Sequence, residues 1–368
     1  MSKVKVGIIG LGEVAQIIHL PILQALSDRY EIAALCDISP SLVAWAGERF
    51  GVSNLYTDAH ELVRQEDLDA VFVLNSDEYH AEHAIAALRA GKHVLIEKPM
   101  TLTVSDADAL IAARDAAGVH VMVGYMRRYA PAFAKACEEL ASLGPIQYAR
   151  IRDIIGQNAM IIEQSSVVQR FADIPQEAVD DRRARAKRMV DEAVGDAPQP
   201  IRNSYRLLAG LNSHDLSAMR ELLGMPKRVV SASHWNDGYY IAATFEFDGY
   251  CATFETGVDF QRRFDAHIEV FGKSKQMRLQ YDTPYIRHLP TTLRIAETIG
   301  DAYEESVHRP TFKDPYTVEL ERFYEVVAQG AAPKTTPEDY KQDLALFRMI
   351  CDALLRNYTS VPQEGERG

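Results

Sequence analysis

The sequence has little cysteine, no excess of basic charge and no long apolar segment. Its four cysteines are far apart and form no Cys-x-x-Cys pair or Cys/His cluster, which argues against a zinc site or a disulfide framework. The formal net charge of −12 argues against nucleic acid or an anionic membrane as the main partner. No apolar stretch approaches the roughly 20 residues that span a bilayer. The apolar run Val6–Leu11 is also too short and too glycine-broken for a signal peptide. We therefore expect a cytoplasmic protein without a metal site.

The first 125 residues alternate short β-branched runs with helical patterns that end at glycines. One helix is expected to begin after the N-cap Ser39, with Pro40 at its first position, and to stop at Gly51. Two further helices should stop at Gly91 and Gly118. Continuously apolar runs are typical of parallel strands buried on both faces, so we predict an α/β fold with a doubly wound parallel sheet. The predicted strands are Val4–Ile9, Glu31–Cys36, Ala70–Leu74, His93–Ile96 and His120–Val123.

After residue 145 the pattern changes to an alternation of apolar and polar residues, which predicts half-buried antiparallel strands. Two predicted helices, Pro315–Gln329 and Pro337–Asn357, follow these strands. We therefore expect domains at 1–125 and 126–361 and a disordered polar tail at 362–368. The predicted strands of the second domain are Ile146–Ile155, Arg228–His234, Tyr239–Phe247, Cys251–Phe260, Ala266–Phe271 and Gln276–Tyr281.

A charged insertion at 156–200 interrupts the second domain, and its residues 177–194 are strongly helical in pattern. Arginines recur every three residues at Arg182, Arg185 and Arg188, beside several acidic residues. Two interpretations are open. The helix is either a solvated element held by ion pairs along its own surface, or a lid that brings these arginines toward an anionic substrate group.

The second sheet also predicts self-association. An open antiparallel sheet has two faces, and the expected helices can cover only one of them. The other face would leave a large apolar patch in water. We therefore expect a homodimer or a homotetramer.

A dinucleotide-binding pattern, Gly10-x-Gly12-x-x-Ala15, follows the first predicted strand and opens a helix. The first glycine permits a tight turn, the second lets the backbone approach the pyrophosphate, and Ala15 lets helix and strand pack closely. Asp37 ends the second strand, where its carboxylate can accept hydrogen bonds from both adenosine-ribose hydroxyls and would repel a 2′-phosphate. Positions 38–42 contain no lysine or arginine that would offset this repulsion. The sequence therefore favours NAD over NADP as the cofactor.

Two residues are candidates for the chemistry. Lys98 follows the strand His93–Ile96 in Glu97-Lys98-Pro99, so it should point into the crevice at the carboxyl end of the sheet. His214 lies at the start of a predicted helix. Taken alone, each has a simpler explanation: an exposed loop lysine, and a capping or core histidine.

Motifs along nearly the whole chain resemble one family, the glucose–fructose oxidoreductase/inositol dehydrogenase/MocA (Gfo/Idh/MocA) oxidoreductases. They occur in the family's order: Gly10–Ala15 with His19-Leu20-Pro21, Val71–Leu74 leading to His80, Glu97-Lys98-Pro99, Gly124–Tyr129, and Ser213-His214-Asp215 ahead of Arg220–Gly224.

The resemblance implies a Rossmann domain followed by an α/β domain with an open antiparallel sheet. It also implies NAD(P)-dependent oxidation or reduction of sugars, inositols or related polyols. Lys98 would contact the reacting hydroxyl and the nicotinamide ribose, and His214 would be the acid/base on the substrate side. The expected cofactor-binding residues are Gly10, Gly12, Glu13, Val14, Ala15, Asp37, Asn75, Ser76, His80, Glu97, Lys98 and Arg128. The expected substrate-binding residues are Lys98, Tyr129, Asn212, His214 and Asp215.

The sequence departs from the family pattern at several points. The family usually has an aspartate four residues before the histidine, and this position is Gly210. Asn212, Asp215 or Tyr205 could take its place. The loop after the third predicted strand reads Asn75-Ser76-Asp77 where the family tends to have Thr-Pro-Asn. The charged insertion also falls where substrate-proximal segments belong.

We predict an NAD-dependent oxidoreductase that acts on a secondary hydroxyl of a sugar, glycoside or inositol-like polyol. His214 would take the hydroxyl proton, and Lys98 would polarise the oxygen. The alternative is an NAD-dependent glycoside hydrolase that oxidises a ring hydroxyl, eliminates the aglycone, adds water and reduces the ring again. A non-catalytic NAD-binding regulator would be expected to lack the lysine or the histidine, and both are present.

Overall fold

The computed structural model describes residues 3–360, which form two compact units. The first unit contains the chain up to Tyr129 together with Ile162–Met189 and Lys313–Lys341. The second contains Ala130–Ile161, Val190–Phe312 and the chain from Gln342 onward. The sequence indicated a single boundary after residue 125, whereas the observed units are discontinuous, because two later segments belong to the N-terminal unit. The tail predicted at 362–368 lies outside the described residues.

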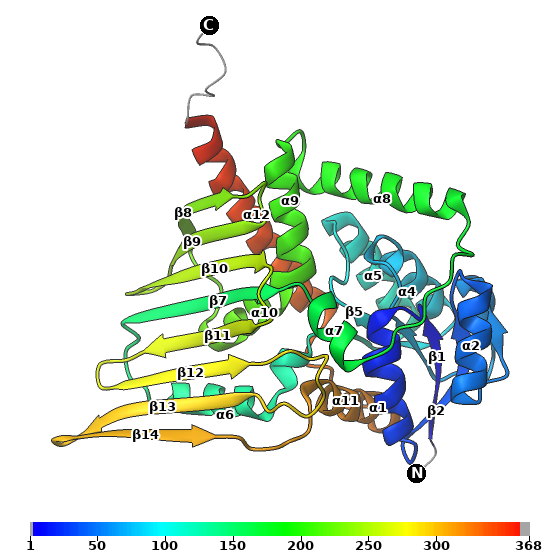
Figure 1. Cartoon of the computed structure of the whole chain (residues 1–368), viewed down its shortest axis with the longest axis horizontal. Coiled ribbons are helices and arrows are strands. Elements are labelled where there is room, and N and C mark those ends of the chain that lie inside the picture. The colour runs from blue at the N-terminus through cyan, green and yellow to red at the C-terminus, as the bar shows by residue number, and fades with distance from the viewer. Residues whose placement is uncertain (1–2, 361–368) are drawn as a thin grey trace, which may run out of the picture. The chain divides into compact units, whose positions relative to one another are not determined.

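The first unit is built on a parallel six-stranded sheet in the order β3-β2-β1-β4-β5-β6. Its strands β1, β2 and β5 are labelled in Figure 1. The chain starts in the centre, winds outward through β3 and then crosses to the other side of β1. Ligands of doubly wound sheets bind outside the carboxyl ends of the strands at this reversal. The predicted doubly wound sheet is therefore confirmed, with a short β3 added. The strands are β1 (Val4–Ile9), β2 (Tyr30–Cys36), β3 (Leu55–Tyr56), β4 (Ala70–Val73), β5 (His93–Glu97) and β6 (Val121–Gly124).

Two helices of the first unit end at glycines that the sequence indicated, and one of them also begins at the indicated cap. The Ser39 hydroxyl accepts a hydrogen bond from the Leu42 N–H at 3.2 Å, and Gly51 ends the helix in the left-handed region with φ of 71°. Gly118 ends a second helix in the same way, with φ of 66°. The helices are α1 (Leu20–Ala25), α2 (Pro40–Phe50), α3 (Ala59–Leu62), α4 (His80–Arg89), α5 (Val104–Ala117) and α11 (Pro315–Gln329). A π-helical turn, Ala15–His19, leads into α1.

The charged insertion contains two helices, α7 (Ala159–Ser165) and α8 (Gln176–Val194). The helix predicted at 177–194 is confirmed, whereas α7 was not predicted. Because Ile162–Met189 belongs to the first unit, most of the insertion packs with the N-terminal sheet and its helices.

The second unit contains an eight-stranded sheet in the order β14-β13-β12-β11-β7-β10-β9-β8. Its pairs are antiparallel except for β7 with β10, which are parallel. The predicted mostly antiparallel sheet is confirmed, and two strands that were not predicted, β13 and β14, extend one edge. The strands are β7 (Tyr148–Gly156), β8 (Arg228–Trp235), β9 (Tyr240–Glu246), β10 (Cys251–Asp259), β11 (Phe264–Phe271), β12 (Lys275–Tyr281), β13 (Thr292–Ile299) and β14 (Ala302–His308). The helices are α6 (Pro131–Leu140), α9 (Gln199–Leu207), α10 (Ser213–Leu223) and α12 (Pro337–Ser360), the last of which starts in the first unit.

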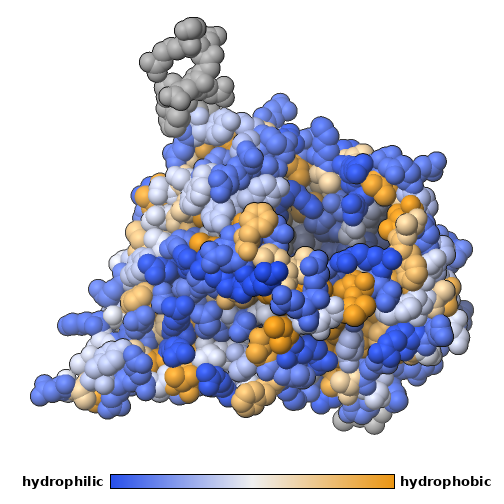
Figure 2. Space-filling view, in the orientation of Figure 1, coloured by the Kyte–Doolittle hydropathy of each residue, from blue (hydrophilic) through white to orange (hydrophobic). Residues whose placement is uncertain are grey.

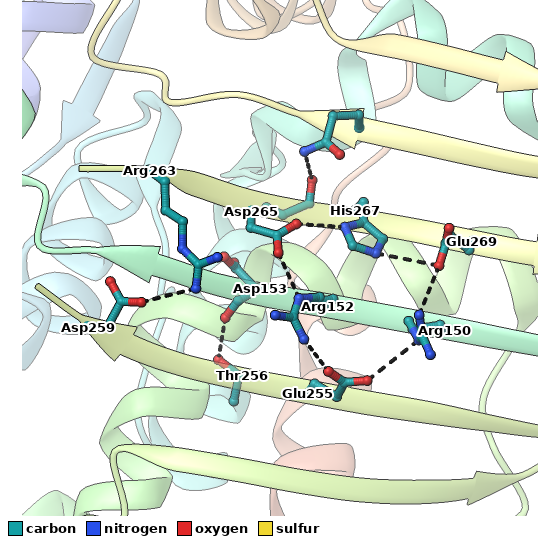
Figure 3. Close-up of polar contacts among 12 residues, drawn as sticks. Arg150, Arg152, Asp153, Glu255, Thr256, Asp259, Arg263, Asp265, His267 and Glu269 are labelled. Carbon is teal, nitrogen blue, oxygen red and sulfur yellow. Dashed lines mark hydrogen bonds and ion pairs between the residues drawn. The ribbon is translucent and has the colours of Figure 1, made fainter. Parts of the chain in front are cut away.

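The two faces of this sheet differ in polarity. Helices α6 and α10 pack on one face, where β7 contributes the buried side chains of Ala149 and Ile151. The opposite face carries a network of charged side chains, in which Arg150 and Arg152 of β7 pair with acidic residues of the neighbouring strands (Figure 3). The visible surface over these strands is accordingly mainly hydrophilic (Figure 2). The expectation of a large apolar patch on this face was wrong, because the polar half of the strand alternation consists largely of paired charges.

Candidate functional site

The glycine pattern forms a tight turn between β1 and the first helical turn. Gly10 has φ of 94°, and a Cβ atom there would lie 2.4 Å from the backbone nitrogen of Asn75, so only glycine fits. At Gly12 a Cβ would meet nothing within 4 Å, which leaves open space beside the backbone. The helical hydrogen bonds begin here with Gln16 N–H to the Gly12 carbonyl at 3.0 Å. The turn therefore provides the open, helix-starting backbone that a pyrophosphate group needs.

Asp37 lies directly beside this turn. Its carboxylate accepts hydrogen bonds from the Leu11 N–H at 2.8 Å and from the Ser39 N–H at 3.0 Å. Burial raises the pKa of Asp37 above its ordinary value, although these two backbone hydrogen bonds act in the opposite direction. The structure thus brings together the residues predicted to hold the pyrophosphate and the adenosine ribose.

A second loop, between β4 and α4, lies next to the glycine turn. His80 contacts the Pro99 carbonyl through Nδ1 at 2.8 Å and the Asn75 carbonyl through Nε2 at 2.9 Å, so it connects this loop with the segment after β5. The buried side-chain oxygen of Asn75 has no hydrogen-bond partner within residues 3–360. Buried polar atoms are nearly always hydrogen-bonded in native proteins. The Asn75 oxygen is therefore suited to a donor of a bound cofactor, which fits the predicted cofactor-binding role of this loop.

Lys98 follows β5 and is half-exposed, and its peptide bond to Pro99 is cis. The preceding Glu97 is buried and accepts a hydrogen bond from the Lys98 N–H at 3.1 Å. The second Glu97 oxygen lies 2.8 Å from His19 Nε2. Burial opposes ionisation of Glu97, but His19 and Lys98 outweigh it and lower the pKa of this carboxyl. An anionic Glu97 anchored by His19 thus fixes the backbone from which Lys98 projects.

Arg128 and Tyr129 have partners within the first unit. The Arg128 guanidinium pairs with Asp339 and lies 5.8 Å from the centre of the Tyr125 ring. The Tyr129 hydroxyl lies 2.8 Å from the Thr335 hydroxyl, and burial raises the pKa of Tyr129. Both side chains therefore help to pack the unit, and their predicted contacts with cofactor and substrate stay predictions.

The substrate-side candidates lie at the start of α10 in the second unit. Asn212, His214 and Asp215 are all buried. The Asn212 amide donates to the Thr256 hydroxyl at 2.8 Å, and this hydroxyl donates to the Asp153 carbonyl at 3.0 Å. The Asn212 side-chain oxygen has no hydrogen-bond partner in the described part of the chain. A buried polar oxygen of this kind is suited to a hydroxyl donor of a substrate.

Gly210, which stands where the family usually has an aspartate, has free space beside its backbone. A Cβ at Gly210 would meet nothing within 4 Å. Of the proposed replacements, Tyr205 is buried with its pKa raised by that burial, so it is a poor base near neutral pH. Asp153, which sequence reasoning did not single out, is a fully buried acid on the helix-covered face of β7. The sequence did contain a sign of this burial, because Asp153 occupies an inward-facing position in the apolar–polar alternation of β7, on the same face as Ile151 and Ile155.

Lys98 belongs to the first unit and His214 to the second, so their cooperation in one reaction stays a prediction.

Among the residues that the structure describes, no group of three or more His, Cys, Asp or Glu side chains could hold a metal ion. Within the same residues, no helix has both the length and the apolar character that crossing a membrane requires.

Of the three arginines in the insertion, Arg185 is engaged within the first unit. It pairs with Glu82 at 2.6 Å and Asp181 at 2.8 Å, and its guanidinium lies 4.4 Å from the centre of the Tyr79 ring. Arg182 and Arg188 are exposed. The contacts of Arg185 are those of the ion-paired helix rather than of an arginine held for a substrate anion.

Comparisons with known proteins agree with the Rossmann fold of the first unit. Residues 4–125 match the family model described as oxidoreductase family, NAD-binding Rossmann fold. The myo-inositol 2-dehydrogenase of Thermotoga maritima is 26% identical over 362 residues, which cover 93% of each chain. The inositol 2-dehydrogenase of Salmonella paratyphi B is 35% identical over 127 residues, which cover 34% of this chain and 38% of that one.

A solved structure is similar over both units. The 3-ketoreductase KijD10 of Actinomadura kijaniata, in complex with NADP and TDP-benzene, has a TM-score of 0.71 and 21% identity. The match covers 96% of this chain and 98% of that one. Residues 4–125 thus match the Rossmann domain of the Gfo/Idh/MocA oxidoreductases, and the glycine turn and the relative aligned over nearly the full length support the same family for the rest of the chain.

Proposed function

We propose that this protein is an NAD-dependent dehydrogenase that oxidises a secondary hydroxyl of an inositol, sugar or related polyol. The observation that carries the proposal is the Asp37 carboxylate hydrogen-bonded to the glycine turn, because this arrangement supports the proposed roles of Asp37 as ribose acceptor and of the turn as pyrophosphate cradle. The name of the Thermotoga maritima relative, myo-inositol 2-dehydrogenase, supports a polyol substrate.

In this proposal some residues bind the cofactor and others act on the substrate. Gly10, Gly12 and the following helical turn hold the pyrophosphate, and Asp37 holds the adenosine ribose. The bound nicotinamide supplies the hydride acceptor. His214 takes the proton of the substrate hydroxyl, a task that histidine performs more often than any other residue in enzymes. The Lys98 ammonium donates a hydrogen bond to the same oxygen and so stabilises the charge that develops on it.

NAD is the preferred cofactor in this proposal, because the Asp37 carboxylate repels a 2′-phosphate. Fold alone does not decide this preference, since the similar 3-ketoreductase structure contains NADP.

The predicted homo-oligomer and cytoplasmic location are part of the proposal. The charged sheet face removes the apolar-patch argument for association, so light scattering must test it against the monomer mass of 41.2 kDa.

The alternative activity, NAD-dependent glycoside hydrolysis, is favoured by one observation: Gly210 stands where a dehydrogenase of this family usually has an aspartate. The two activities give different products. In hydrolysis NAD is reduced and reoxidised within one turnover, whereas a dehydrogenase accumulates NADH.

One experiment separates them. The purified full-length protein is incubated with NAD⁺ and a panel of inositols, sugars and aryl glycosides, while NADH formation and aglycone release are followed in parallel. NADH accumulation with a polyol supports the dehydrogenase. Aglycone release without net NADH supports the hydrolase, and neither signal with any compound in the panel would contradict both.

A further inference from the structure

The charged insertion crosses the nucleotide-binding edge of the first unit (Figure 1). Its segment before α8 contacts the helical turn that follows the glycine motif. Gln16 and Gln169 form two hydrogen bonds, from the Gln16 amide to the Gln169 carbonyl at 3.1 Å and from the Gln169 N–H to the Gln16 oxygen at 2.9 Å. Arg170 pairs with Glu13 at 2.9 Å. The segment is thus attached beside the proposed pyrophosphate cradle.

Four residues beyond Gln169, Asp173 reaches the start of α2. The Ser39 hydroxyl and the Ser41 N–H both donate to its carboxylate, the second at 2.8 Å. These hydrogen bonds, led by that of Ser39, lower the pKa of Asp173 to about 2, so the group is an anion at neutral pH. The hydrogen-bond donors at the start of α2 are therefore already used by a carboxylate of the chain itself.

Asp173 and Asp37 flank the same serine. Ser39 donates its N–H to Asp37 and its hydroxyl to Asp173, which brings the two carboxylates close to each other. The charge of Asp173 also contributes to the raised pKa of Asp37. A 2′-phosphate on the adenosine ribose would have to lie beside Asp37, where donors such as the Ser39 hydroxyl and the Ser41 N–H would otherwise be available to it. Asp173 both takes these donors and adds a second negative charge.

The other end of the segment is fixed on the loop before α4. The Tyr79 hydroxyl donates to Asp181 at 2.7 Å, and Arg185 pairs with Asp181 and Glu82 while stacking over the Tyr79 ring. Because Asp173 lies between this attachment and the Gln16–Gln169 pair, its position does not depend on Ser39 alone.

We propose that Asp173 is a cofactor-selecting residue that acts with Asp37 to exclude the 2′-phosphate of NADP. The proposal rests on the function proposed above, in that it requires the dinucleotide to occupy the Gly10–Asp37 site. It adds a selecting group from a segment more than a hundred residues away from the dinucleotide motif.

The test is a set of binding titrations with the full-length protein, using NADH and NADPH separately by calorimetry and without substrate. Asp173→Asn removes the charge and keeps the shape, and Asp173→Glu restores the charge. Asp180→Asn is the matched control, because this exposed acid pairs with Gln176 and Arg183 of its own helix, α8. Asp173→Ser serves as a second neutral variant if Asp173→Asn does not fold.

We expect Asp173→Asn to lower the preference for NADH over NADPH by about tenfold, mainly through tighter NADPH binding. Asp173→Glu and Asp180→Asn should keep the preference of the unmodified protein. The inference would be overturned if both Asp173→Asn and Asp173→Ser kept a preference for NADH over NADPH within about twofold of that of the unmodified protein. That result would leave NAD binding intact. Failure of the unmodified protein to bind either nucleotide would instead overturn the proposed function itself. Equal binding of NADH and NADPH by the unmodified protein would overturn the inference together with the proposed NAD preference, but not dinucleotide binding.

Discussion

His19 Nε2 lies 2.8 Å from Glu97 Oε1, and both side chains are almost completely shielded from solvent. His19 comes from the π-helical turn after the glycine motif, and Glu97 ends β5 next to Lys98. The pair therefore connects the start of the cofactor site with the backbone of the proposed catalytic lysine. Its removal should affect both stability and the position of Lys98.

Replacing His19 with Leu should lower the free energy of unfolding by about 3–5 kcal/mol, because the Oε1 atom of the buried Glu97 carboxylate loses its partner and keeps no compensating charge from His19. Urea denaturation measures this loss. The exposed pair of Arg183 with Asp180 provides the control, since Arg183→Ala should cost less than about 1 kcal/mol. A loss for His19→Leu as small as that of the control would show that the pair is not stabilising.

The pH dependence of stability should change with Glu97. Its folded-state pKa is lowered, so its contribution is present above its unfolded pKa, near about 4.3, and is lost as the pH falls through the lower folded value. In Glu97→Gln the free energy of unfolding should not show this loss as the pH falls. The variant should nevertheless be less stable than the unmodified protein at neutral pH. Unfolding curves recorded from pH 3 to pH 7 give the comparison, and parallel curves for both proteins would contradict the assignment.

Glu319 of α11 should show the opposite behaviour. It is fully buried, and neither carboxylate oxygen has a hydrogen-bond partner among the described residues. Burial, and then the charge of Glu97, raise its pKa well above the ordinary value. A raised folded pKa gives stability that is complete below the unfolded pKa and is lost as the pH rises toward the folded value.

Glu319→Gln should therefore remove a decline in stability that accompanies rising pH, and the difference in the free energy of unfolding from the unmodified protein should grow between pH 4 and pH 8. Denaturant unfolding at several pH values provides the measurement. Asp180→Asn, an exposed acid, should leave the slope unchanged. A slope that Glu319→Gln does not alter would mean that this carboxyl titrates normally.

Asp37→Ser should narrow the proposed preference for NAD over NADP, because it removes the carboxylate that we propose to accept the ribose hydroxyls and to repel a 2′-phosphate. Calorimetric titration with both cofactors measures the ratio of affinities. Binding of NADP as tight as that of NAD by the unmodified protein would contradict the proposed preference. A preference unchanged in Asp37→Ser would show that another residue sets it.

Local signals in the sequence predicted much of the first unit correctly. The Ser39 cap, the left-handed glycines Gly51 and Gly118, and the turn at Gly10 depend only on neighbouring residues and backbone geometry. The apolar runs of the parallel strands are equally local. For the same reason, the residues around the glycine motif and Asp37 could be placed together before the structure was known.

Other features depend on contacts between distant positions. Gln16 meets Gln169 across 153 residues, and nothing in the charged segment signals this partner. Strand β14 has almost entirely exposed side chains and thus no apolar alternation to reveal it. On the second sheet, Arg150 and Arg152 were visible as polar positions, but only strand pairing shows that Glu255 and Asp265 neutralise them. Register, not composition, decides the polarity of that face.

The central functional prediction concerns Lys98 and His214. Lys98→Ala and His214→Ala should each lower kcat by about 10² or more on a verified substrate, because each removes a group that acts on the reacting hydroxyl. The affinity for NAD should change little in His214→Ala, since its proposed contact is with the substrate. Two surface variants serve as controls and should keep full activity: Lys341→Ala, which removes an ion pair with Asp108, and His60→Ala, whose ring lies 3.4 Å from Glu82.

The double variant tests whether the two residues act as a unit. Residues that act together in one step are strongly non-additive, because removing either one already abolishes most of their joint effect. The Lys98→Ala/His214→Ala protein should therefore be far more active than the product of the two single losses predicts. Losses that multiply would indicate two independent roles. Near-full activity in either single variant would remove that residue from the proposed mechanism.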